Sequence, residues 1–178
     1  MVFSTPLFLF YFLPVFLVFY YFSNHKIQNV LLLVFSIFFY TWGAPKFILI
    51  VLSSLLIDFS IIKKMNNYEG KKRRWFLIAS IILNTGFLLY FKYANFFVEN
   101  VNNIMNWFGF EAVSWTKVLL PIGISFFTFQ KMSYTIDVYR KNGNPLKTVF
   151  DYALYILMFP QLIAGPIVRY KEVESQLY

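Results

Sequence analysis

The chain has 178 residues, of which 59% are hydrophobic and 13% charged, whereas soluble domains average about 25% charged residues. So much apolar surface excludes a compact water-soluble globule of this size. The absence of cysteine excludes disulfides, and a single histidine, His25, leaves no histidine-based metal cluster.

Six apolar segments follow one another along the chain and predict an all-α, polytopic transmembrane protein. A stretch of about 20 apolar residues spans the hydrocarbon core of a bilayer, and slightly shorter stretches also serve. The predicted spans are 3–22, 27–44, 47–62, 75–91, 118–136 and 152–168.

Basic residues account for the net charge of +8 and lie in short runs between these segments. This pattern indicates membrane topology rather than a nucleic-acid groove, because cytoplasmic loops are enriched in lysine and arginine. With six spans, the loops after the first, third and fifth share one side and both termini lie on the other. The basic residues of these loops are Lys26, Lys63, Lys64, Lys71, Lys72, Arg73, Arg74, Arg140, Lys141 and Lys147.

The segment 94–109, between the fourth and fifth spans, has a different pattern. Phe97, Val101, Ile104 and Phe108 share one helical face, and asparagines occupy the opposite face. This predicts one amphipathic helix lying in the membrane interface and ending at Gly109. A surface helix packed on other spans fits the pattern equally well.

Polar residues inside predicted spans are candidates for function. Asp58 either serves a proton or cation path or, as the sequence favours, lies at the cytoplasmic end near Lys63 and Lys64. In the span 118–136, Pro121 and Gly123 are expected to loosen or kink the outer end.

The same span has too many polar side chains for a helix that faces lipid. Gln130, Ser133 and Asp137 are predicted to share one stripe, so this helix is expected to face protein or a water-filled cavity. Interhelical hydrogen bonding alone is the simpler alternative. A second polar edge consists of Ser125, Thr128 and Thr135.

The segment FPQLIAGPIVRY, at 159–170, breaks the sixth span. Pro160 and Pro166 interrupt a helix and Gly165 permits a bend, a backbone tolerated at membrane depth only inside protein or along a cavity. Gln161 offers a donor and an acceptor to such a cavity. We therefore predict a substrate-channel lining without metal or catalytic residues, consisting of Gln161, Pro160, Gly165, Pro166, Gln130 and Ser125.

Four segments resemble the membrane-bound O-acyltransferase family, most closely its bacterial alginate O-acetyltransferase-like branch. They are MVFSTPLFLFYFLPVFLVFYY at the start, FKYANFF at 91–97, LLPIGISFFTFQKMSYTIDVYR at 119–140 and FPQLIAGPIVRY at 159–170. The resemblance runs in the right order along nearly the whole chain.

The resemblance implies a bacterial inner-membrane or plasma-membrane enzyme whose helices surround a funnel. Such an enzyme passes acyl groups, here expected to be acetyl, to an extracellular polysaccharide or cell-wall polymer. The donor would be a cytoplasmic thioester, acetyl-CoA or an acyl carrier protein, and no other cofactor is expected. The implied partners are the lipid bilayer and a periplasmic or extracellular acyltransferase, and no nucleic acid is expected.

One departure from the family concerns its hallmark histidine, which lies in a later part of such proteins. His25 stands in a short loop near the start and does not match it. We therefore expect residues 1–178 to be a single N-terminal membrane region, truncated and inactive alone. The alternatives are a non-catalytic structural membrane subunit and, less favoured because no internal repeat is visible, a small transporter using Asp58, Lys131 and Asp137.

Overall fold

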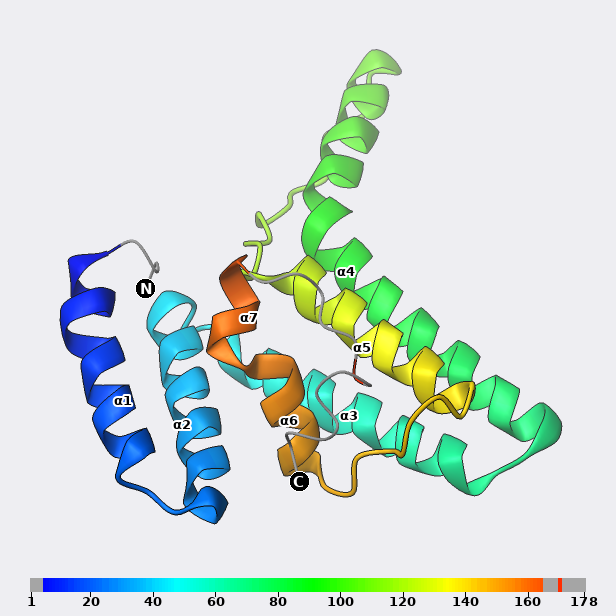
Figure 1. The fold of residues 1–178 in the computed structure, drawn as a ribbon. Helices are drawn as coiled ribbons and strands as arrows, with labels where there is room; N and C mark the ends of the chain where they lie inside the picture. The colour runs from blue at the N-terminus through cyan, green and yellow to red at the C-terminus, as the bar shows by residue number, and fades with distance from the viewer. Residues whose placement is uncertain (1–4, 165–169, 171–178) are drawn as a thin grey trace.

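The computed structural model describes residues 5–164 and Tyr170, and these residues form helices and loops without a strand (Figure 1). The predicted all-α class is therefore confirmed for the described part of the chain. In order, the elements are the π-helical η1 (Phe8–Phe12), α1 (Leu13–Tyr21), α2 (His25–Gly43), α3 (Ile48–Asn67), α4 (Gly70–Trp107), α5 (Ile124–Tyr139), α6 (Val149–Leu157) and α7 (Phe159–Ala164).

The span count stays a prediction. Within the described residues, α4 is the one helix that is both long and apolar enough to cross a membrane, and the shorter helical stretches Phe8–Tyr21 and Ile27–Gly43 are also apolar. α3 has sufficient length, but Asp58, Lys63 and Lys64 interrupt its apolar character.

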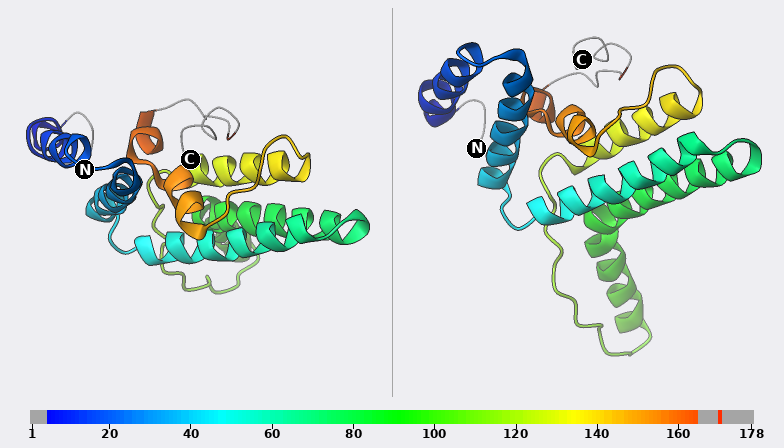
Figure 2. Two further views of the ribbon diagram at one scale, coloured as in Figure 1. Left: turned by 60° about the horizontal axis from the view of Figure 1, so that its bottom comes forward. Right: turned by 90° about the horizontal axis from the view of Figure 1, so that it is seen from below.

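The main core lies where α3, α4 and α5 pack together and α6 covers them, with α2 against α6 (Figure 2). Its centre consists of fully buried side chains, among them Val51, Leu55, Phe127, Tyr134 and Tyr155. The first turn of α6 and the middle of α3 and α5 thus meet in one packed interior.

A second, aromatic core joins the N-terminal helices to α7. Phe8, Phe12 and Phe16 recur every four residues, so they share one helical face. The ring of Phe159, at the start of α7, lies 5.5 Å from the ring of Phe12 and 5.1 Å from that of Phe16, edge to face in both cases. Edge-to-face pairs at this spacing are favourable beyond their buried area, so they fix α7 against η1 and α1.

The segment 94–109 does not form a helix of its own, contrary to the prediction, because α4 continues without interruption to Trp107. Residues 91–95, where one predicted helix ends and the next begins, include no proline or glycine, so nothing in the local sequence ends the helix. Figure 1 and Figure 2 show that α4 instead bends along its length, and its second part extends away from the other helices.

The predicted span 118–136 also differs from the helix observed. α5 begins only at Ile124, after Pro121 and after Gly123, whose φ of 75° is left-handed. Glycine adopts this conformation at little cost. Pro121 and Gly123 therefore precede the helix rather than kink it, and the segment before them is irregular.

Candidate functional site

The predicted break in the sixth apolar segment is present, and it separates α6 from α7 at Met158. Met158 has φ −49° and ψ 113°, outside the helical region. Pro160 occupies the second position of α7, where a missing N–H costs no helical hydrogen bond. Gly165 and Pro166 lie outside the described residues.

Side chains from two other helices satisfy the interrupted backbone. In an unbroken helix the N–H of Phe159 would donate to the carbonyl of Tyr155. Here the Phe159 N–H donates to Ser36 Oγ of α2 at 3.1 Å, and the Tyr155 carbonyl accepts from Gln130 Nε2 of α5 at 2.9 Å. The break is thus held inside protein, as buried backbone polar groups require.

Gln130 and Gln161, both predicted to line a channel, are brought together by this geometry. Gln130 Nε2 donates to Gln161 Oε1 at 3.0 Å in addition to its bond with the Tyr155 carbonyl. Gln130 is fully buried, and its Oε1 has no hydrogen-bond partner among the described residues. A buried amide oxygen in this state can accept a hydrogen bond from a hydroxyl or from water.

The remaining predicted residues are less closely associated. Ser125 is half-buried in the first turn of α5, and Pro160 is exposed. Thr128, by contrast, is fully buried, and its hydroxyl is without a partner in the described part of the chain.

Asp58 has the most complete polar environment in the described core. Its carboxylate accepts hydrogen bonds from Ser80 Oγ at 2.6 Å, Asn84 Nδ2 at 2.9 Å and Tyr152 Oη at 2.6 Å. Asp58, Ser80, Asn84 and Tyr152 are fully buried. Asp58 is thus enclosed by α4 and α6 and bonded to neutral groups, and its position near the cytoplasmic end stays a prediction.

Lys131 is a buried cation that contacts the same helix as Asp58. Its Nζ donates to Ser54 Oγ at 3.2 Å and lies 5.8 Å from the centre of the Phe87 ring. Ser54 precedes Asp58 by one turn of α3 on the same helical face, so Lys131 contacts α3 one turn from the carboxylate. Three donors already occupy the Asp58 carboxylate, which argues against an open cation path through it.

Gln130, Ser133 and Asp137, predicted to share one stripe, have different surroundings. Gln130 is covered by Tyr155 and Gln161, whereas Ser133 and Asp137 are half-buried beside a shallow groove that Arg140 also lines. Helical spacing alone predicts a shared direction, but it does not predict how far a covering helix extends.

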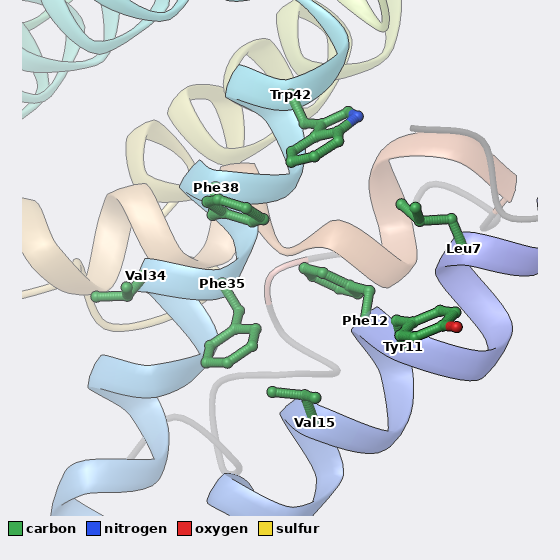
Figure 3. Close-up of a pocket in the computed structure, with 8 residues that line it drawn as sticks. All are labelled: Leu7, Tyr11, Phe12, Val15, Val34, Phe35, Phe38 and Trp42. Atoms are coloured by element: carbon green, nitrogen blue, oxygen red, sulfur yellow. The ribbon is translucent and has the colours of Figure 1, made fainter.

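An apolar groove of about 530 Å³ lies between the N-terminal helices and α2 (Figure 3). Its walls include Phe12, Phe35, Phe38 and Trp42, and no charged side chain contributes to them. Apart from the Tyr11 hydroxyl and the Trp42 indole N–H, the side chains that line the groove are hydrocarbon, so we place the candidate polar site at the α6–α7 break.

Sequence reasoning missed Ser36, Ser80, Asn84 and Tyr152 as members of polar clusters. A signal was present for two of them, because Ser54 and Asp58 on α3 and Ser80 and Asn84 on α4 both have a spacing of four residues. Two i, i+4 polar pairs on neighbouring helices favour mutual hydrogen bonding.

Apolar outer faces around buried polar clusters are typical of a helical membrane protein. Comparison with known proteins shows which membrane proteins the chain is similar to. The chain is 42% identical to a probable alginate O-acetylase AlgI of Pseudomonas aeruginosa over 179 residues, which covers 99% of this chain and 34% of the relative. The corresponding protein of Pseudomonas putida is also 42% identical, with 99% and 37% covered.

A peptidoglycan O-acetyltransferase of Helicobacter pylori is 34% identical, with 99% of this chain and 38% of the relative covered. No family model and no solved structure matches the chain. The chain is a homologue of these O-acetylating proteins, as its resemblance to the membrane-bound O-acyltransferase family predicted. It spans a little over a third of the length of these relatives.

Proposed function

We propose that residues 1–178 form the N-terminal membrane region of a membrane-bound O-acyltransferase in the bacterial inner or plasma membrane. This enzyme transfers acyl groups, most simply acetyl, to an extracellular polysaccharide or cell-wall polymer. Its donor is a cytoplasmic thioester, acetyl-CoA or an acyl carrier protein, and a periplasmic or extracellular acyltransferase is a fitting partner. The observation that carries the proposal is the identity of 42% to an alginate O-acetylase along 99% of the chain.

We further propose that the chain crosses the membrane six times, with its basic loops in the cytoplasm. Contacts between two of these loops support this arrangement. Arg73, at the start of α4, donates to the carbonyls of Val138 and Tyr139 at 2.8 and 3.1 Å, and Lys141 Nζ lies 4.0 Å from Glu69 Oε1. The loops that the positive-inside rule assigns to one side are thus adjacent in space.

Within this enzyme, Gln130 and Gln161 are proposed to line the path of the acceptor. The support is the buried Gln130 Oε1, which has no partner among the described residues, at a broken helix inside the protein. An acceptor hydroxyl could donate to this oxygen while the rest of the pair holds α7 in place. Ser125, Gly165 and Pro166 remain proposed members of the same wall.

A chimera tests the proposal. The matching third of the Pseudomonas aeruginosa relative is replaced by residues 1–178, and acetyl ester on alginate is measured in cells that lack the native protein. We expect the chimera to restore O-acetylation. Gln161→Leu should lower acetylation while membrane insertion stays normal, and Asn103→Leu, which changes an exposed amide, is the matched control.

An unacetylated polymer despite a correctly inserted chimera would contradict the proposed function. Equal acetylation in the Gln161→Leu and Asn103→Leu chimeras would instead contradict only the assignment of the glutamine pair.

The purified 178-residue chain should not transfer acetyl groups by itself. His25 is its single histidine and begins α2, and a general base must lie within hydrogen-bond reach of the acceptor hydroxyl. Acetyl release from a thioester in the presence of polysaccharide is the measurement. Turnover that a substitution in this chain abolishes would show that the chemistry lies within these residues.

A further inference from the structure

The second part of α4 and the segment that follows it form an arm, defined here as residues 94–121. Figure 1 and Figure 2 show this part of α4 extending away from the other helices, with the following segment running back beside it. The arm is not part of the candidate site.

Two asparagines join the segments of the arm. Asn102 Nδ2 donates to the carbonyl of Val113 at 3.1 Å, and the Val113 N–H donates to Asn102 Oδ1 at 2.8 Å. Asn95 makes the same pair of bonds with Val118, at 2.8 and 2.9 Å. A spacing of seven residues places both asparagines on one face of the helix, so this polar face is occupied by the returning chain.

The opposite face of the arm has no cover in the described structure. Phe97, Val101, Ile104 and Phe108 are between 47% and 72% exposed, and Trp107 is 93% exposed. Apolar residues exposed singly are ordinary, whereas a largely apolar face, here interrupted by the exposed Asn100, indicates an interaction surface.

The charges of the arm indicate which surface it contacts. They are Glu99, Glu111 and Lys117, and Lys117 Nζ lies 3.7 Å from Glu99 Oε1. Without a basic excess, the arm has no electrostatic attraction to anionic headgroups. Exposed phenylalanine and tryptophan favour the boundary between headgroups and acyl chains, where aromatic side chains gather.

We propose that the arm lies in the headgroup–acyl boundary of the leaflet at the outer end of α4, with its apolar face in lipid. The arm is continuous with the helix that is long and apolar enough to span, so lipid is the nearest apolar phase to the exposed face. The hydrogen bonds of Asn95 with Val118 and of Asn102 with Val113 hold the helix and the returning segment together. The inference rests on the proposed membrane crossing by α4.

Tryptophan quenching by brominated lipid tests this location. The protein is reconstituted into phosphatidylcholine vesicles with Trp107 as the sole tryptophan and Trp42, Trp75 and Trp115 changed to phenylalanine. Bromine near the glycerol end of the acyl chains should quench Trp107 more than bromine near the bilayer centre. Ile82→Trp, at a position 65% exposed on α4, is the sole-tryptophan reference and should show the reverse order.

Trp107 and Ile82→Trp together distinguish a wrong location of the arm from a wrong membrane crossing by α4. If Ile82→Trp is quenched by deep bromine but Trp107 by neither lipid, the arm stands in water or meets a protein partner, and the inference is wrong. If Ile82→Trp is also unquenched, the proposed crossing by α4 fails with it.

Amide hydrogen exchange tests the hydrogen bonds between Asn102 and Val113 independently of the depth of the arm in the membrane. Asn102→Leu removes both bonds to Val113, so the Val113 amide should exchange about tenfold faster, as expected for the loss of about 1.4 kcal/mol of local protection. Asn103→Leu, one residue along on an exposed position, should leave that amide unchanged. Equal exchange rates of the Val113 amide in the two variants would show that Asn102 does not hold the returning segment.

Discussion

Asp58 illustrates how a carboxylate becomes acceptable in the interior of this helical protein. A buried charge is costly unless hydrogen bonds and an opposite charge compensate it. Ser80, Asn84 and Tyr152 each donate to the carboxylate, and Lys131 Nζ donates to Ser54, one turn earlier on α3. The donors come from α4 and α6, so one residue of α3 connects three helices.

Removing the hydroxyl that donates to Asp58 should weaken this connection. Tyr152→Phe deletes the donor at 2.6 Å, and hydrogen bonds to charged groups contribute about 1.5–3 kcal/mol. We expect a loss of that size in the free energy of unfolding, measured by denaturation in mixed micelles. Tyr90→Phe removes the same group from an exposed ring, and an equal loss there would contradict the assignment.

Asp58 and Lys131 should be energetically coupled. Lys131→Met removes the buried cation and its hydrogen bond to Ser54, and hydrogen bonds to charged groups contribute about 1.5–3 kcal/mol. In the double variant with Asp58→Asn, the loss should be smaller than the sum of the two single losses. The same denaturation measurement gives the four values of the cycle, and additive losses would show that the charges act separately.

Gln130 and Gln161 stand out in the sequence because an amide in an apolar span needs a partner, and the structure pairs them. That they line a channel stays a prediction. The environment of Asp58 could not be predicted, because it depends on α6 covering α3. Ser80 and Asn84 looked unremarkable in an apolar span until Asp58 was placed beside them.

The break between α6 and α7 shows how elements are fixed from outside their own sequence. Pro160 explains why a helix is interrupted in this region, but Ser36 and Gln130 explain why the interrupted backbone is tolerated. The break near Pro160 could be predicted from proline, whereas the start of α5 after Gly123 was missed, because Pro121 and Gly123 were expected to kink a helix that the structure begins only at Ile124. The continuity of α4 beyond residue 91 was missed because hydropathy changes there while helix propensity does not.

Ser36→Ala should therefore destabilise the position of α7. The change removes the buried hydroxyl that accepts the Phe159 N–H, and losing such a partner costs about 1–3 kcal/mol. We expect faster proteolysis in the α6–α7 region and a lower unfolding midpoint. Ser60→Ala, which removes an exposed hydroxyl bonded only within α3, should have little effect, and similar results for the two variants would exclude a special role for Ser36.

At the scale of the whole molecule, the connections α1–α2, α3–α4 and α5–α6 lie toward one end, and the tip of the arm lies toward the other (Figure 1). Arg73 connects two of these loops through its bonds to the last carbonyls of α5. A cation at the C-terminus of a helix also complements the helix dipole. One arginine of the basic loop thus has a structural role in addition to its place in the charge bias that predicts topology.

The orientation can be tested with single cysteines, because the chain has none of its own. Asn67 ends α3 beside the basic loop and Asn103 lies on the arm, and both are exposed. In intact cells an impermeant thiol reagent should label Asn103→Cys and spare Asn67→Cys, because lysine and arginine are retained on the cytoplasmic side. Permeabilised cells should show labelling at both positions, which verifies that each cysteine is accessible. Labelling of position 67 but not 103 in intact cells would reverse the proposed topology, and the arm would then face the cytoplasm.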